Sequence, residues 1–133
     1  MLIVVDTNVV VSGLLNPNGP PGRIVDLIAA NLVQVAYDDR VLAEYEDVLS
    51  REPFSFSLRQ ISALIDHIRL NGALVSPLPL RPASYPDLKD LPFAEVAIAA
   101  GVGTIVTGNK AHFSFVAAYG IAVLSPAEFL RQI

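Results

Sequence analysis

Residues 1–12 read MLIVVDTNVVVS. Residues 2–5 form an unbroken apolar run, which is typical of a strand buried on both faces of a parallel sheet. The run ends at Asp6, and Thr7 and Asn8 follow it. Three polar side chains are therefore expected at the carboxyl end of a central strand, the edge at which open α/β sheets bind ligands. A half-buried Asp6 carboxylate needs hydrogen-bond donors, a cation or a catalytic task there.

The bulk composition is that of one globular domain spanning residues 1–133. The chain is 53% hydrophobic and 17% charged, which excludes intrinsic disorder. It has no cysteine, so disulfides and thiolate metal sites are excluded. No apolar run approaches the roughly 20 residues that a membrane span needs. Because the chain enters a strand directly, we expect no signal peptide, no membrane partner and a cytoplasmic location.

Further apolar runs and helical periodicities alternate along the chain. This alternation predicts an α/β fold, a three-layer α/β/α sandwich around a central, mainly parallel sheet of four to five strands. The expected strands are 2–5, 33–37, 104–106 and 121–124, with a proline-broken edge strand within 74–80. The expected helices are 8–15, 23–32, 40–50, 58–71, 93–100 and 127–133, with a loop over 16–22, a polar loop over 85–92 and a short helical turn over 111–119.

Two helices place an acid where it can face the sheet edge. On the helix expected over 40–50, Glu44 lies at the border of the apolar face, whereas Glu46 and Asp47 point away from it. Asp90 stands at the start of the helix expected over 93–100.

Four stretches of the sequence carry a family resemblance. They read VVDTNVVVSGLL (4–15), DRVLAEYEDVLSR (39–51), DLKDLPFAEVAIAAGVGTIVTGNKAHF (87–113) and AVLSPAEFLRQI (122–133). In this order and at these spacings, they resemble PIN-domain nucleases (the PilT N-terminus family). Within that family they are most similar to the VapC-like ribonucleases, the toxin components of toxin–antitoxin pairs. The resemblance covers essentially the whole chain.

The resemblance implies which acids bind metal. The metal-binding acids of the family fall on Asp6, Glu44 and Asp90 of this chain. Asp87 lies in the same loop as Asp90 and is the alternative for the third acid; Asp90 is preferred because it stands directly at the start of the helix.

The resemblance also implies a polar corner after the strand expected over 104–106. The fourth catalytic position, usually Asp in the family, is occupied by Asn109. Asn8 and Thr107 fall where the family uses small polar residues to support the site. An amide offers a metal a carbonyl oxygen but no charge, so a second metal should be held weakly or only together with substrate.

The implied activity is that of a metal-dependent endoribonuclease, a hydrolase of RNA phosphodiester bonds that uses Mg²⁺ or Mn²⁺. These hard ions bind carboxylate oxygens, activate water and neutralise charge that develops on phosphate. The net charge of −4 argues against a nucleic-acid partner, but with the three acids set aside, ten acids face nine bases. The family further implies an antitoxin partner and a homodimer.

Each candidate residue has a structural alternative. Asp6 also fits a turn after a strand, Glu44 a solvated helix border, and Asp90 a helix N-cap. Asn109 also fits a turn beside a glycine, and Thr107 a strand-end filler.

Other functions fit parts of the same pattern. A catalytically weak or inactive PIN module that binds RNA or a protein is the main alternative. Response-regulator receivers fit poorly, because they need paired acids before the first buried strand ends and this chain has one Asp there. Asp-x-Asp phosphatases fit poorly, because Asn8, and not an acid, lies two residues after Asp6. His67 and His112 lack the partners of a catalytic triad, and His112 is expected to be structural or close to the substrate. The Phe54/Phe56 pair is expected in the core or an interface more than as a base-stacking platform.

Overall fold

The computed structural model describes residues 1–80 and 88–133, and it contains a five-stranded sheet in which every neighbouring pair is parallel. The strand order is β3-β2-β1-β4-β5, so β1 is central. β2 and β3 are added on one side of β1, and β4 and β5 on the other, so the strand order reverses between β1 and β4. The strands are β1 (Leu2–Val5), β2 (Gln34–Tyr37), β3 (Ala73–Leu74), β4 (Thr104–Val106) and β5 (Ala122–Leu124).

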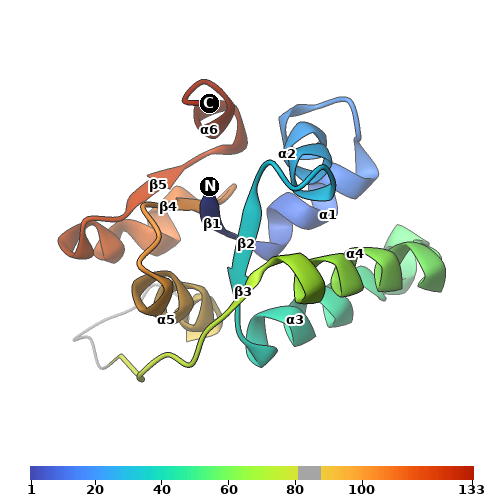
Figure 1. Ribbon diagram of the computed structural model, residues 1–133. Coiled ribbons are helices and arrows are strands. Elements are labelled where there is room, and N and C mark those ends of the chain that lie inside the picture. The colour runs from blue at the N-terminus through green and yellow to red at the C-terminus, as the bar shows by residue number, and fades with distance from the viewer. Residues whose placement is uncertain (81–87) are drawn as a thin grey trace.

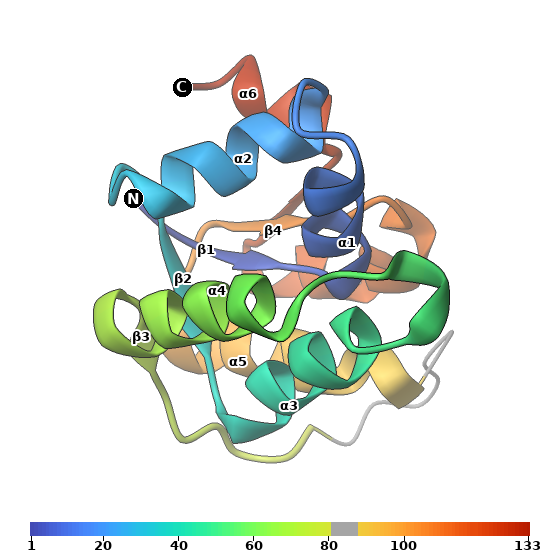
Figure 2. The same ribbon diagram turned by 90° about the vertical axis from the view of Figure 1, so that its right-hand side faces the viewer.

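Helices cover both faces of this sheet, which confirms the predicted three-layer architecture (Figure 1). In the view of Figure 2, α2 and α6 lie above the sheet, and α3 and α5 lie below it. The α-helices are α1 (Thr7–Leu15), α2 (Pro20–Ala29), α3 (Asp39–Leu49), α4 (Leu58–Asn71), α5 (Leu91–Ala100) and α6 (Pro126–Leu130). Three 3₁₀ helices are η1 (Glu52–Phe54), η2 (Leu88–Asp90) and η3 (Lys110–Tyr119).

The register of β1 against β4 brings two polar residues side by side. Val5 pairs with Val106, so the next residues, Asp6 and Thr107, leave adjacent strands at the same level. The Asp6 N–H donates to the Val106 carbonyl at 2.9 Å, which extends the ladder to the strand end. Ligands of open α/β sheets bind at such a reversal of strand order, at the carboxyl edge.

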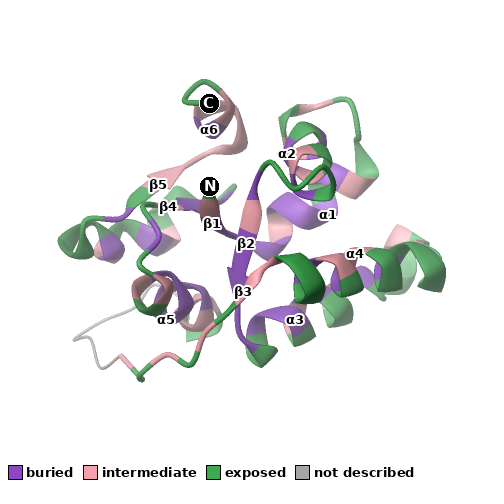
Figure 3. Cartoon of the chain, viewed as in Figure 1, coloured by how far each residue is buried: buried purple, intermediate pink, exposed green. Residues whose placement is uncertain are grey.

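Large aromatic side chains fix the two helices below β1. Tyr45 of α3 and Phe93 of α5 are both fully buried, with ring centroids 6.1 Å apart. An ion pair adds to this contact, because Arg40 of α3 reaches Glu95 of α5 at 2.7 Å. Figure 3 shows that buried residues concentrate on the sheet and on the helix faces toward it. The elements that carry Glu44 and Asp90 are thus held against each other.

The start of α2 differs from the prediction. A helix was expected over 23–32, but α2 spans Pro20–Ala29 and includes the Pro-Pro-Gly segment assigned to a loop. Prolines are tolerated in the first helical turn, where their missing N–H groups have no partner in any case. Gly22 is needed because a Cβ there would overlap the backbone of Pro17.

Other deviations are changes of length at element ends. β3 spans only Ala73–Leu74, and α6 ends at Leu130 instead of Ile133. Residues 88–90, expected in a loop, form the 3₁₀ helix η2, and the helical turn expected over 111–119 is the ten-residue 3₁₀ helix η3. The predicted helix over 58–71 is confirmed with its boundaries, and its N-cap Ser57 accepts from the Gln60 N–H at 3.0 Å. Within residues 1–80 and 88–133, none of the helices combines the length and apolar character needed to cross a bilayer.

Replacing Gly22 by alanine is expected to lower the free energy of unfolding by about 3 kcal/mol, because α2 must move away from the segment before it. Gly103→Ala is the matched control, because nothing lies within 4 Å of a Cβ at Gly103. Urea denaturation of both variants measures the difference. Equal midpoints for the two variants would contradict this close approach.

Candidate active site

Asp6 stands directly after β1 and is only 6% exposed. Its carboxylate accepts hydrogen bonds from the Thr7 N–H at 2.8 Å, the Thr107 hydroxyl at 2.7 Å and the Asn8 amide at 3.2 Å. Burial raises the pKa of Asp6 above the ordinary value of 3.8; the Thr107 hydrogen bond lowers it, and the charge of Asp90 raises it. The donors expected for a buried Asp6 are present, and the charge of a second acid acts on it.

Glu44 reaches the same place from α3. Its carboxylate accepts the hydroxyl of Thr7, the residue after Asp6, at 2.5 Å. Glu44 is half-buried, whereas its neighbours Glu46 and Asp47 are exposed, as their helix positions predict. The side chain of Glu44 is therefore bonded within the fold and is not simply a solvated border acid.

The buried Tyr45 fixes α3 beneath the end of β1. Its hydroxyl donates to the carbonyl of Val5 at 2.5 Å. Burial raises the pKa of Tyr45 well above its usual range, and the charges of Asp6 and Glu44 raise it further. The phenol therefore stays protonated and remains a donor at physiological pH.

Asp90 lies at the N-cap position of α5, but its side chain makes no capping hydrogen bond. Its Oδ2 instead lies 2.9 Å from Nδ1 of His112 in η3. The simple N-cap alternative for Asp90 therefore does not describe its side chain. Asp87, the other acid considered for this position, lies outside the described residues.

The corner after β4 is built around two side-chain contacts. The Gly108 N–H donates to the Asn8 carbonyl oxygen at 3.1 Å, and the Asn109 N–H donates to the Thr107 hydroxyl oxygen at 2.9 Å. Thr107 is fully buried, and its hydroxyl donates a hydrogen bond to the Asp6 carboxylate at 2.7 Å. Asn8 and Thr107 thus connect the corner to Asp6, while Asn109 is exposed beside them.

One cavity of about 360 Å³ unites these residues, and we call it the acid cavity. Asp6, Glu44, Asp90 and Asn109 all line it, although they come from four separate parts of the chain. The other lining residues are Thr7, Asn8, Val11, Ser12, Val48, Phe54, Lys89 and His112.

The acid cavity suits a divalent cation by the type of its donors. It contains three carboxylates and an amide oxygen, the ligands that Mg²⁺ and Mn²⁺ prefer, and the mutual effect of Asp6 and Asp90 is repulsive. Within the described part of the chain, however, no three Asp, Glu or His side chains are arranged to hold an ion as they stand. Glu44 is turned to Thr7 and Asp90 to His112, so metal binding requires these side chains to leave their present partners.

Among the lining residues that the sequence analysis did not assign to the site, three lie next to its acids or bond to them. Thr7 bonds to Glu44, His112 bonds to Asp90, and Lys89 precedes Asp90 in η2. Thr7 had a signal, because it lies inside the polar run after β1. His112 was expected to be structural or close to the substrate, but its bond to Asp90 had no signal in the sequence, because that contact depends on how η3 folds back toward α5.

The Phe54/Phe56 pair packs against the core and also reaches the acid cavity. Phe54 and Phe56 stack with ring centroids 5.8 Å apart and an interplanar angle of 18°, and both are half-buried against the core. Phe54 also lines the acid cavity.

Replacing Asp6 by asparagine tests the electrostatics of the metal-free site. Because the folded pKa of Asp6 is raised, the folded state binds its proton more tightly than the unfolded chain does. The stability contributed by Asp6 is therefore greatest below the unfolded pKa and decreases as pH rises through the folded pKa. Without metal, Asp6→Asn is expected to unfold at or above the wild-type temperature near pH 7.5, an advantage that disappears near about pH 4.

Thermal melts of both proteins across this pH range provide the measurement. Mn²⁺ at about 100 times its dissociation constant should stabilise the wild type by about 2.7 kcal/mol and leave the variant unchanged. A variant several degrees less stable than the wild type near pH 7.5 in EDTA would mean that the acids do not repel one another.

Comparison with known proteins gives three findings. The family model for the PIN domain matches residues 2–111. The crystal structure of VapBC2 from Rickettsia felis bound to a DNA fragment from its promoter contains a similar chain, with a TM-score of 0.55 and 20% identity over 94% of this chain and 98% of that chain. The uncharacterized protein MJ1680 of Methanocaldococcus jannaschii is 65% identical over 26 residues, 20% of this chain and only 17% of that protein.

Proposed function

Because this chain belongs to the PIN domain family, whose members are in general nucleases and typically depend on divalent metals, we propose that it is a metal-dependent endoribonuclease. The supporting observation is that three carboxylates and Asn109, from four separate segments, line one cavity at the carboxyl edge of the sheet. Structural roles alone give no reason for these acids to gather around a common cavity.

We assign Asp6, Glu44 and Asp90 as the residues that hold Mg²⁺ or Mn²⁺, with Asn109 as the fourth catalytic residue. A bound ion would supply an activated water and neutralise charge that develops on the phosphate oxygens. The protein positions the ligands: Thr107, Asn8 and the Thr7 N–H fix the carboxylate of Asp6 from three directions. Such orienting hydrogen bonds tune ligands in metal sites generally.

A toxin of a toxin–antitoxin pair is the biological role we propose. The structural neighbour comes from a VapBC2 complex crystallised with promoter DNA, and it matches almost all of this chain. By this analogy, the partner is an antitoxin protein. From the family resemblance of the sequence, we further propose that the protein pairs with a second copy of itself and acts on RNA in the cytoplasm.

The alternative is a PIN module with weak or no catalysis that binds RNA or a protein. The identity of Asn109 favours this alternative, because three acids line the acid cavity where the family resemblance implies four. Cleavage that needs millimolar metal would fit a weak enzyme, and binding of RNA without cleavage in any metal would fit the inactive module.

The test is cleavage of single-stranded RNA with Mn²⁺ and with EDTA. Glu44→Gln is expected to lose at least about 100-fold in rate, since even residues that only orient metal ligands cost about 10–100-fold. Glu46→Gln is the matched control, because Glu46 lies on the same helix and is exposed. Equal rates for the two variants would contradict the assignment of Glu44.

A further inference from the structure

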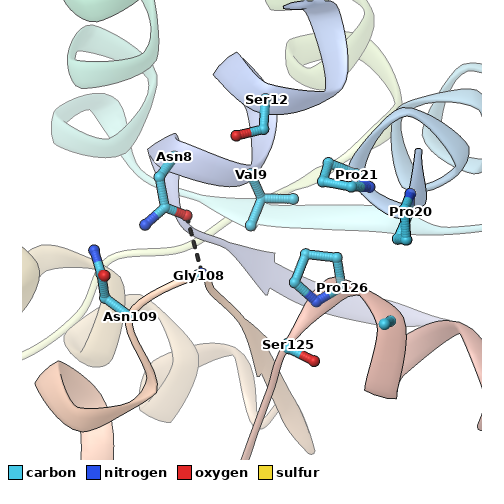
Figure 4. Close-up of a pocket in the computed structure, with 10 residues that line it drawn as sticks. Asn8, Val9, Ser12, Pro20, Pro21, Gly108, Asn109, Ser125 and Pro126 are labelled. Atoms are coloured by element: carbon cyan, nitrogen blue, oxygen red, sulfur yellow. Dashed lines mark hydrogen bonds between the residues drawn. The ribbon is translucent and has the colours of Figure 1, made fainter. Parts of the chain in front are cut away.

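A second cavity, of about 510 Å³, lies beside the acid cavity, and we call it the proline cavity. Its walls come from α1, from the first turns of α2 and α6, and from the corner after β4 (Figure 4). The side chains used below are Val9, Ser12, Pro20, Pro21, Ser125 and Pro126.

The proline cavity has a neutral and largely apolar lining. None of the described residues that line it is charged, so a phosphate group would find no counter-charge among them. Three prolines and Val9 offer apolar surface, and the prolines are rigid, so a ligand seated on them immobilises little. Ser12 and Ser125 add hydroxyl groups, and the Ser125 oxygen accepts the Glu128 N–H at 3.2 Å. A hydroxyl both donates and accepts hydrogen bonds. This lining suits a flat, neutral group with polar edges.

The two cavities adjoin along shared side chains. Asn8, Ser12 and Asn109 line both of them. Asn8 is held in place because it accepts from the Gly108 N–H (Figure 4) and donates to Asp6. The proline cavity therefore lies one side chain away from the carboxylates, at a separation that the Asn8 contacts fix.

We propose that the proline cavity binds the base of a nucleotide next to the phosphodiester bond that is cleaved. The inference rests on the proposed function and specifies its substrate. Nucleobases are neutral rings with two apolar faces and polar edges, and the chain of a nucleic acid connects each base to a phosphate nearby. A base enters such a cavity only when it is unpaired and unstacked, so the substrate is single-stranded RNA or a loop.

The experiment measures binding of fluorescein-labelled single-stranded RNA by anisotropy, in the Asp6→Asn background so that no cleavage occurs. A single abasic position is moved along the strand. One position is expected to weaken binding about 10-fold, the effect of losing one seated base.

The matching test on the protein is a variant in which a larger side chain fills the proline cavity. Ala127 lines the proline cavity but not the acid cavity. Ala127→Phe should therefore block the proline cavity, weaken binding of intact RNA by a similar factor and make binding insensitive to the abasic position. Gln132→Phe adds the same ring at an exposed position of the same segment and should bind like its parent.

Equal sensitivity to every abasic position would overturn the inference, as would equal affinities of the two phenylalanine variants. If Ala127→Phe does not fold, the abasic series on its parent decides alone. Wild-type hydrolysis of bis(p-nitrophenyl) phosphate with Mn²⁺ tests the acid cavity separately, since that diester carries no base. Its failure counts against the proposed function, while the binding series still decides the proline cavity.

Discussion

Asp6→Asn is expected to reduce Mn²⁺-dependent RNA cleavage by at least about 100-fold, the largest loss for any single replacement in the acid cavity. Asp6 is the most enclosed of the three carboxylates, and its hydrogen bonds reach both Asn8 and Thr107. An amide at this position brings no negative charge to a cation and presents N–H groups toward the donors that now hold the carboxylate.

The control for this replacement is Asp66→Asn. Asp66 lies on α4, is exposed and pairs only with Arg69 of its own helix among the ion pairs of the described residues. Initial cleavage rates at saturating Mn²⁺ should be unchanged for Asp66→Asn. Cleavage by Asp6→Asn within a fewfold of the wild type, with the metal dependence retained, would remove Asp6 from the site.

Asn109→Asp is expected to lower the Mn²⁺ concentration for half-maximal cleavage by about 10-fold or more. The change restores a fourth acid where the family resemblance implies one, and charge–charge attraction to a divalent ion is strong in a partly enclosed site. Asn109 is exposed at the corner after β4, so the added charge should cost little folding stability. Titrations of cleavage rate against Mn²⁺ measure the shift.

An added negative charge elsewhere separates the local effect from a change in net charge. Asn18→Asp places it in the exposed loop before α2 and should leave the metal titration unchanged. If Asn109→Asp and Asn18→Asp give the same half-maximal concentration, Asn109 does not face the ion.

The fold was readable from the sequence because its central strands β1, β2 and β4 are mostly buried and therefore appear as apolar runs. The runs 2–5 and 104–106 end at polar residues, and both strands are confirmed. The structure adds that they are neighbours in the sheet. The first turn of α2 was misassigned because Pro20 and Gly22 indicate a loop by local propensity. Their helical role depends on the tight packing of Gly22 against the Pro17 backbone, a contact that no local pattern specifies.

The candidate site was readable only in part. Spacing on α3 predicted that Glu44, and not Glu46, turns inward, and the Thr7–Glu44 bond agrees with this. The pairing of Asp90 with His112 joins two segments whose relative placement depends on the packing of α5 and η3, so the sequence alone could not predict it. The metal-binding roles of Asp6, Glu44 and Asp90 stay predictions.

The most direct measurement is a crystal soaked in Mn²⁺ and examined by anomalous diffraction. The account predicts a peak in the acid cavity, with the Asp6 and Asp90 carboxylates bound to it and Glu44 released from Thr7. A fully soaked crystal without anomalous density between these carboxylates, and with Asp90 still bonded to His112, would contradict it.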